Sequence, residues 1–368
     1  MDFILSRTGL LNNLQAVKNV INTKNTNPIL DNFLFDFQGD KLVISGSDGE
    51  THMSAQLTLE TPETAKLVIP ADKLLNTIKN LPEQPLKFSI EDNIMKITAE
   101  GGNYVLAAFP GNEFPIPQPS ENVFERKIPA SLLAEAIHKT LFAVSNDDMR
   151  PTLTGVLFHF RPDLTNIVAT DAHKLVRFSI KNISSDEEFE FIVPKKPLQI
   201  MKSTVNGDDE ATVKFSDRKM ELHFDNLMLS TTLITGKFPA YEQVIPTHNP
   251  YVLILERESF IAALKRVSIY ASQTTNLIIM EVQGANLSLT ARSEETSSEA
   301  MEHLPVNYEG EDIKLGFNAK SLLEIVSNLD GEQIEINMSA SNRPVLFKPM
   351  ENITENEEVL MLLMPISF

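Results

Sequence analysis

Three segments of similar pattern recur in this chain at a spacing of 124 residues, and this repeat is the strongest constraint on its fold. The strings VIPADKLLNTI, IVPKKPLQIMKS and LGFNAKSLLEIV each join a short apolar run to a helical pattern. The joins lie at Pro70, Pro194 and Asn318. Internal repeats of this kind indicate that one structural unit is built several times.

Two further landmarks follow the same spacing. Phe114-Pro115 and Phe238-Pro239 are 124 residues apart, and Asp48 and Asp171, which each follow an alternating strand pattern, are 123 apart. We therefore predict three tandem domains, with boundaries at residues 1–121, 122–247 and 248–368.

Each copy combines two kinds of periodicity. Apolar residues recur at three- and four-residue steps over 8–21, 130–144 and 257–271, which predicts a first helix in each copy. Strings such as LKFSI, ATVKFS and IEINMSA alternate apolar and polar residues and predict strands. The expected fold is α+β, with two helices and about eight strands per domain. Alternation also predicts one covered and one solvated face for the sheets.

Composition narrows the cellular setting. The chain has no cysteine, which excludes disulfides, thiolate metal sites and a cysteine nucleophile. It has no apolar run of about 18 residues, and its N-terminus, MDFILSRTG, lacks the pattern of a signal peptide. We expect a cytoplasmic protein without a membrane contact.

Positive charge is concentrated on the predicted helices. The net charge is −18, yet the helix segments contain twice as many basic as acidic residues. If the helices share a surface, that surface attracts a polyanion. Lysine is also a good helix former, so a merely solvated face, as in a scaffold that binds no DNA, remains an alternative. No zinc-finger, basic-zipper or helix-turn-helix pattern is present, so sequence-specific DNA reading is not indicated.

The string ATDAHKL, residues 169–175, most resembles a catalytic or metal site. It holds Thr170, Asp171, His173 and Lys174 within five positions. Asp171 and His173 lie two residues apart without a nucleophile in a recognisable turn, which argues against a hydrolase. The histidines show no HxH or HExxH spacing, so we expect no metal and no cofactor.

The whole chain resembles the bacterial sliding clamps, the beta subunits of replicative DNA polymerase. The resemblance rests on an ordered set of motifs, namely NPIL, LVIPADKLL, EFPIP, LTGVLF, ATDAHKL, VPKKPL, GKFPAYEQVIP, GFNAKSLLEIV and LLMPISF. It implies a non-catalytic processivity factor, in which two chains join head to tail into a six-domain ring around double-stranded DNA. The implied partners are the polymerase alpha subunit, a clamp loader, and other replication and repair proteins that carry a clamp-binding motif.

The resemblance also implies a pocket for partner peptides between the second and third domains. Its deep part is expected to comprise Leu153, Thr170, His173, Lys174, Leu175, Pro239, Val244, Leu362 and Met364. Its shallow part is expected to comprise Asn318, Pro344 and Pro365. The chain departs from the family pattern at Ala172, Lys174, Gln243 and Ser321, which affects the polar contacts of the rim.

Two more groups of residues are expected to act by the same resemblance. DNA contacts are predicted for Lys24, Lys73, Arg150, Lys195, Lys196 and Lys202. The interface between the two chains is predicted to join Tyr104 and Leu106 of one chain to Ile269 and Tyr270 of the partner subunit.

Overall fold

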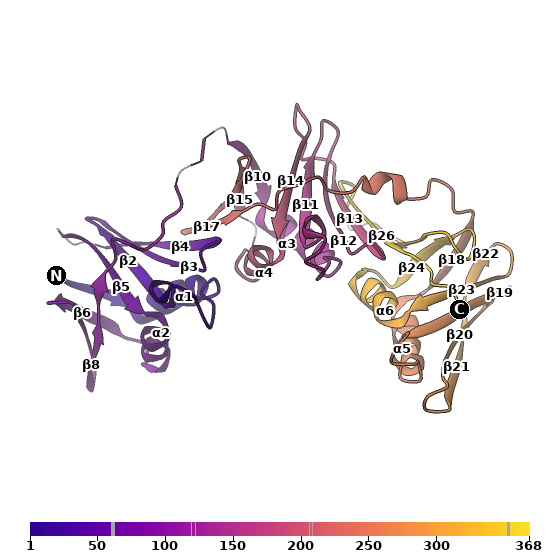
Figure 1. Ribbon diagram of the computed structural model, residues 1–368, viewed down its shortest axis with the longest axis horizontal. Coiled ribbons are helices and arrows are strands. Elements are labelled where there is room, and N and C mark those ends of the chain that lie inside the picture. The colour runs from indigo at the N-terminus through magenta and orange to yellow at the C-terminus, as the bar shows by residue number, and fades with distance from the viewer. Residues whose placement is uncertain (60–62, 119, 122, 206, 208, 352–353) are drawn as a thin grey trace. The chain divides into compact units, whose positions relative to one another are not determined.

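The protein folds as the α+β architecture that the sequence predicts. The computed structural model describes residues 1–59, 63–118, 120–121, 123–205, 207, 209–351 and 354–368. Within these residues it contains six α-helices, two for each predicted domain: α1 (Arg7–Lys18), α2 (Ala71–Asn80), α3 (Ala130–Leu141), α4 (Lys195–Thr204), α5 (Arg257–Ser268) and α6 (Ala319–Asn328). α1 packs against α2, and α5 packs against α6 (Figure 1).

The chain forms two compact units. The first unit contains Met1–Ala134 and Lys196–Leu233, and the second contains Glu135–Lys195 and Ile234–Phe368. Residue 122, where we expected the first domain boundary, lies outside the described residues.

Each unit contains one nine-stranded and one four-stranded antiparallel sheet. The first nine-stranded sheet has the order β10 (Phe124–Pro129), β15 (Glu210–Phe215), β16 (Lys219–Phe224), β17 (Leu227–Thr232), β4 (Thr51–Thr58), β3 (Lys41–Ser47), β2 (Asn32–Gln38), β5 (Thr64–Pro70) and β9 (Phe109–Pro110). The four-stranded sheet of this unit has the order β1 (Asp2–Ser6), β6 (Pro85–Glu91), β7 (Ile94–Ala99) and β8 (Gly102–Ala107).

The second unit repeats this arrangement. Its nine-stranded sheet has the order β14 (Phe189–Pro194), β11 (Gly155–Phe160), β12 (Thr165–Thr170), β13 (Lys174–Ile180), β26 (Glu357–Leu363), β25 (Val345–Pro349), β24 (Gln333–Met338), β18 (Tyr251–Glu256) and β22 (Asn307–Glu309). Its four-stranded sheet has the order β21 (Ser298–Pro305), β20 (Asn286–Ser293), β19 (Leu277–Gln283) and β23 (Ile313–Asn318).

The repeat determines which strands join. In each nine-stranded sheet, a half from one domain meets a half from the next, and the joining pairs are β17 with β4 and β26 with β13. Each four-stranded sheet corresponds to one half of a nine-stranded sheet. The strand at the joining position is β8 in the first unit and β21 in the second. Within the described residues, each of these two strands pairs with a neighbour on one side only. The outer edges of β8 and β21 are therefore open to further pairing.

The first helix of every copy is shorter than its apolar periodicity predicts. We expected 8–21, 130–144 and 257–271, but α1, α3 and α5 end three residues earlier. The backbone continues in tighter turns, as in the bonds from Val20 N to Val17 O and from Ile21 N to Lys18 O. Such 3₁₀-type turns keep apolar side chains directed inward after the α-helix has ended.

The prediction of one solvated sheet face holds for some strands and is wrong for others. Strands β6, β7, β15 and β20 alternate buried and exposed residues. In contrast, all residues of β11 and β12 are buried. The reason is that the Phe-Pro connectors cover the second face: Phe114 packs with Leu34 and Val68, and Phe238 packs with Leu157 and Val168.

No helix in the described part of the chain is both long enough and apolar enough to cross a membrane.

Candidate functional site

An apolar cavity lies within the second unit, at the joint between β13 and β26. It has a volume of about 200 Å³. We call it the apolar cavity, and it is lined by Leu153, Thr170, Ala172, His173, Lys174, Leu175, Pro239, Ala240, Tyr241, Val244, Leu362 and Met364. The structure thus brings together all nine residues predicted for the deep part of the pocket. Sequence reasoning missed Ala240 and Tyr241, and it named Ala172 only as a departure from the family pattern.

The floor of the apolar cavity belongs to a continuous core. Leu153, Leu175, Tyr241 and Leu362 are buried in one cluster of side chains, and Met364 packs against it while remaining partly exposed. Val244 stands at the rim with 50% of its surface exposed. A rigid apolar floor with an adaptable methionine at the edge suits an apolar anchor residue of a ligand.

The string ATDAHKL forms a tight turn at one wall of the cavity rather than a catalytic cluster. The Thr170 hydroxyl donates to the Lys174 carbonyl (2.7 Å) and accepts from the Ala172 amide (3.1 Å). Asp171 Oδ1 accepts from the backbone amides of His173 and Lys174, each at 2.9 Å. The carboxylate is therefore engaged in holding the turn and is not free to orient His173 as a general base.

The ammonium group of Lys174 turns away from the apolar cavity. It lies 2.7 Å from Asp171 Oδ2 and 3.2 Å from Glu324 Oε2, and the lysine side chain is only 9% exposed. Only the aliphatic stem of Lys174 is left to line the cavity, as is common for long basic side chains.

The turn contains a strained residue at the family departure Ala172. Its φ is +77°, in the left-handed region that costs a residue with a Cβ atom about 1–2 kcal/mol. We expect Ala172→Gly to increase the free energy of unfolding by about 0.5–1 kcal/mol, after the larger entropy loss of glycine is subtracted. Urea unfolding measures this change. Ala240→Gly is the control, because Ala240 has φ −67° and should lose stability instead. If Ala172→Gly instead lowered the free energy of unfolding, the result would contradict the conclusion that Ala172 is strained in this turn.

The Asp171–Lys174 pair makes stability depend on pH. Burial raises the pKa of Asp171, but hydrogen bonds from Lys174 and from the turn amides outweigh it and leave that pKa lowered. The same partners, against the effect of burial, leave the pKa of Lys174 raised. The Asp171 contribution is present above about pH 4 and is lost as the pH falls through its lowered pKa. The Lys174 contribution is present below about pH 10 and is lost as the pH rises through its raised pKa.

We expect Lys174→Met to reduce the free energy of unfolding by about 2 kcal/mol at neutral pH, because Asp171 loses its charged partner. The loss should shrink below pH 4, where the carboxyl is protonated in the unfolded chain. Lys195→Met is the matched control, since Lys195 bonds only to the neutral Asn146 side chain among the described residues. An equal loss in both variants, or a loss independent of pH, would show that the pair does not carry the stability.

Behind the cavity, Tyr241 is held by a chain of buried polar groups. Ser179 donates to Asn166 (2.7 Å), and Asn166 Nδ2 donates to the Tyr241 hydroxyl (2.9 Å). That hydroxyl lies 2.9 Å from His159 Nδ1, and His159 Nε2 lies 2.6 Å from Glu188 Oε1. The distances fit a chain in which Tyr241 donates to Nδ1 and Nε2 donates to Glu188. Burial raises the pKa of Tyr241, so its hydroxyl keeps its proton at neutral pH.

His159 also belongs to a grouping that the sequence spacing did not indicate. With Glu188 and Glu190 it forms a set of three possible metal ligands whose atoms lie within 4.8 Å of one another. His159 faces Glu190 across the β11–β14 pair, so the set comes from two strands rather than from one helix. Because His159 contacts both Glu188 and the Tyr241 hydroxyl, we interpret His159 as a residue that supports Tyr241.

The family is decided by comparison of the whole chain with known proteins. Sequence profiles of the DNA polymerase III beta subunit match in order: the N-terminal domain at residues 1–118, the central domain at 127–240 and the C-terminal domain at 242–367. The chain belongs to the DNA polymerase III beta subunit family. It is accordingly a sliding clamp built of three clamp domains, a processivity factor of DNA replication and not an enzyme.

Individual relatives agree with this assignment. The chain is 27% identical to the beta sliding clamp of Pseudomonas putida over 356 residues, which is 96% of this chain and 97% of the relative. The solved sliding clamp of Pseudomonas aeruginosa bound to griselimycin has a TM-score of 0.95 at 27% identity, and that of Bartonella birtlesii bound to griselimycin has 0.94 at 26%. Both structures are covered completely, as is this chain.

The shallow residues of the predicted clamp pocket lie outside the lining of the apolar cavity. Asn318 caps α6, and its side chain accepts from the amides of Lys320 (3.1 Å) and Ser321 (3.2 Å). The Pro344 carbonyl accepts from Asn249 (3.0 Å). Pro365 is half-buried in the C-terminal tail. Asn318 therefore has a structural role as the N-cap of α6.

The predicted DNA contacts of the clamp divide into two groups. Lys24, Lys73 and Lys202 are exposed, and none of them forms an ion pair with another described residue. Arg150 and Lys195 line one cavity of about 560 Å³ in the second unit. Arg150 is paired there with Asp147 (2.9 Å).

Lys196, the sixth predicted DNA contact, is bonded within the first unit. Its ammonium donates to Val20 O (2.9 Å), to Asn22 Oδ1 (2.7 Å) and to Asp48 Oδ2. All three of its N–H donors are therefore engaged within the first unit. Lys196 therefore helps to hold the turn at Asp48 in place, and its contact with DNA stays a prediction.

Other basic residues of the helices are engaged in the same way. Arg7 donates to the carbonyls of Ile78 and Lys79 at the end of α2, and buried Lys139 donates to Asn328 O and pairs with Asp330. Cations at helix C-termini satisfy carbonyls that have no partner in the helix. The count of basic residues on the helices therefore overstated the charge available for DNA.

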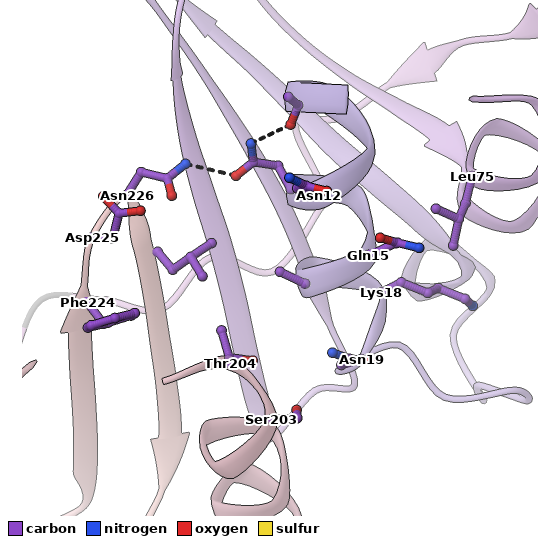
Figure 2. A pocket seen from close by; sticks show the side chains of 14 residues that line it. Asn12, Gln15, Lys18, Asn19, Leu75, Ser203, Thr204, Phe224, Asp225 and Asn226 are labelled. Atoms are coloured by element: carbon purple, nitrogen blue, oxygen red, sulfur yellow. Dashed lines mark hydrogen bonds between the residues drawn. The ribbon is translucent and has the colours of Figure 1, made fainter. Parts of the chain in front are cut away.

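A polar groove in the first unit is lined largely by neutral polar side chains. It has a volume of about 890 Å³ and lies between α1, the end of α4 and the turn from β16 to β17 (Figure 2). Asn12 and Gln15 of α1 and the C-cap residue Asn19 line it together with Ser203 and Thr204 of α4. Asn226 donates to Asn13 across the groove (2.8 Å). Its charged lining residues are Lys18 and Asp225, and the rest of its polar lining is neutral.

The predicted interface residues are on the surface with one exception. Tyr104 on β8 is 38% exposed, and Ile269 and Tyr270 after α5 are 78% and 42% exposed. Leu106 is 8% exposed and packs within its own unit, whereas its neighbour Val105 is 63% exposed. Exposed apolar side chains beside an open strand edge are typical of a surface that another chain covers.

Proposed function

We propose that this clamp acts as a head-to-tail homodimeric ring that encircles double-stranded DNA in the cytoplasm and tethers the DNA polymerase III alpha subunit. We also propose that the three domains span 1–121, 122–247 and 248–368. The observation that carries the ring is the open edges of β8 and β21, which are the strands equivalent to the joined pairs β17–β4 and β26–β13. Pairing β8 with β21 of a second copy completes both four-stranded sheets.

The interface in this proposal combines that strand pairing with apolar contacts. Tyr104 and Val105 of one chain would pack near Ile269 and Tyr270 of the partner subunit. Leu106 is already buried within its own unit, so in this proposal it would hold β8 in place.

The ring predicts a dimer of about twice 41.1 kDa. We expect sedimentation velocity at micromolar concentration to give this mass for the wild type, and a monomer for Val105→Glu, because a carboxylate on the open edge opposes apolar pairing. Met149→Glu is the matched control, since Met149 is 88% exposed and belongs to neither β8 nor β21. A wild-type monomer, or a dimer undisturbed by Val105→Glu, would oppose the interface.

DNA binding in the proposal is sequence-independent. Lys24, Lys73, Arg150, Lys195, Lys196 and Lys202 would contact phosphates, Lys196 by exchanging part of its bonding within the first unit. The neutral amides and hydroxyls of the groove in Figure 2 would add positioning hydrogen bonds. Few unpaired cations suit a clamp that must slide, because each tight phosphate contact would slow its movement along the duplex.

Partner binding in the proposal uses the apolar cavity. An apolar anchor of a partner peptide would enter between Leu175 and Leu362, with Met364 and Val244 at the rim. Pro344, Pro365 and the cap residue Asn318 would form the shallow extension. The same pocket would serve the polymerase, the clamp loader and other proteins with a clamp-binding motif, one at a time.

A further inference from the structure

The first unit contains a second cavity that the repeat makes equivalent to the apolar cavity. It has a volume of about 240 Å³. We call it the polar cavity, and it is lined by Ser47, Gly49, Glu50, Thr51, His52, Pro115, Ile116, Pro117, Gln118, Lys219, Ser230, Thr231 and Thr232. The sequence prediction assigned no role to any of these residues.

Three separate segments establish the equivalence. Pro115–Pro117 and Pro239–Tyr241 are 124 residues apart in the repeat. His52 on β4 pairs with Ser230 on β17, as Leu175 on β13 pairs with Leu362 on β26. In both cavities these segments supply lining residues.

The turn that walls each cavity has the same hydrogen bonds. The Ser47 hydroxyl donates to the Thr51 carbonyl (3.0 Å) and accepts from the Gly49 amide (3.0 Å). Asp48 Oδ1 accepts from the amides of Glu50 (3.0 Å) and Thr51 (2.7 Å). These bonds reproduce those of Thr170, Asp171 and Lys174. In each turn a lysine ammonium binds the second carboxylate oxygen, from Lys174 in one case and from Lys196 in the other.

The two cavities differ in the chemistry of their floors. The apolar pair Leu175 and Leu362 is replaced by His52 and Ser230, which are 4% and 3% exposed. Met364, two residues after Leu362, corresponds to Thr232, two residues after Ser230. An apolar anchor would leave the buried polar groups of His52 and Ser230 without partners, which is costly.

His52 has hydrogen-bonding capacity that its own fold does not use. Its Nδ1 is buried without a hydrogen-bond partner among the described residues. Burial lowers the pKa of His52 to about 4, so at neutral pH its uncharged imidazole offers one donor and one acceptor. The Ser230 hydroxyl beside it offers both as well. The one lysine of the lining, Lys219, donates to the Gln118 carbonyl (2.9 Å). His52 and Ser230 at the floor are therefore uncharged and complement a neutral group with a donor and an acceptor side by side, while the charged side chains of the lining are Glu50 and Lys219.

We infer that the polar cavity is a second peptide-anchor site, which binds the carboxamide side chain of a glutamine or asparagine in an extended partner segment. A carboxamide carries an N–H donor and a carbonyl acceptor, which complement His52 and Ser230. Pro115, Ile116 and Pro117 form the apolar wall for the methylene groups of the side chain. The comparison with a peptide pocket rests on the proposed function, but carboxamide binding at His52 does not require it.

The test compares two small probes, N-acetylglutamine amide and N-acetylleucine amide, by ligand-observed NMR titration of the full chain. We expect the wild type to bind the glutamine probe saturably with a Kd on the order of 1 mM, a strength typical of so small a ligand. The double variant His52→Leu, Ser230→Leu copies the floor of the apolar cavity. It should bind the glutamine probe at least tenfold more weakly and gain a site for the leucine probe.

Controls separate the two cavities. Val244→Ser alters only the rim of the apolar cavity and should leave the glutamine probe unaffected. Thermal unfolding checks that the double variant is folded, and soaking wild-type crystals with the glutamine probe locates it independently of any variant. The proposal is overturned if the wild type shows no saturable binding, if the Val244→Ser variant and not the double variant loses it, or if the crystals show the probe away from His52. Binding of polymerase peptides, measured in parallel, tests the proposed function separately.

Discussion

Cutting a circular duplex is expected to release a clamp that stays bound to the intact circle. A closed ring is held on DNA by topology, so it needs no strong contact with any phosphate. Once an end is available, the ring slides off, because weak contacts to phosphate are sequence-blind and exchange easily. We expect nearly complete retention on nicked circles after gel filtration and nearly complete loss from the same DNA after linearisation.

Charge variants separate topology from attraction in this experiment. Lys24, Lys73 and Lys202 are the exposed lysines among the proposed contacts. Replacing all three with alanine should reduce the dependence of DNA association on salt by roughly 0.9 in logarithmic slope for each contact that is lost. It should not shorten retention on circles that have already been loaded. Lys196→Ala is a different kind of variant, because it removes the bonds to Asp48, Val20 and Asn22 and should lower stability instead. Equal retention on circular and linear DNA would rule out the topological mechanism.

The domain plan could be predicted from sequence because the repeat is fixed by rigid landmarks. Pro70 and Pro194 precede α2 and α4, and Asn318 caps α6, so these positions mark helix starts that cannot shift by a residue. The ends of the first helices could not be predicted as well. Apolar periodicity continues through the 3₁₀ turns after Lys18 and Ser268, and only the backbone hydrogen bonds show where the α-helix ends.

The functional charges could not be predicted from a count. Arg7, Lys139 and Lys196 all lie on helices, but each binds carbonyl or carboxylate oxygens from residues 71 or more positions away in the sequence. Pairing across such distances is a property of the folded chain. The same reason explains why the polar cavity and the chain from Glu188 to Tyr241 were missed, since each is assembled from segments that are far apart in the sequence.

The motif ATDAHKL shows how a shared framework and a particular function can overlap. Asp171 has the same bonds as Asp48, so the acid at this position holds a turn in both copies. What differs is the residue that follows on the strand, Leu175 in one copy and His52 in the other. The repeat thus supplies two cavities of one design, and single side chains decide what each can bind.

Removing Met364–Phe368 is expected to abolish binding of polymerase-derived peptides while the dimer persists. The tail is attached by bonds from Met364 N to His173 O (2.8 Å) and from Ile366 N to Gly316 O (2.8 Å), and Met364 closes the rim of the apolar cavity. Losing the apolar contacts that Met364 and the tail make with a bound peptide costs about 2–3 kcal/mol, or a factor of roughly 30–150 in Kd. Deleting only Ser367 and Phe368 is the matched control, because neither lines the cavity, and it should leave the affinity nearly unchanged. Fluorescence anisotropy with a labelled peptide measures the affinities, and sedimentation checks the dimer. Undiminished peptide binding after the longer deletion would place the partner site elsewhere on the clamp.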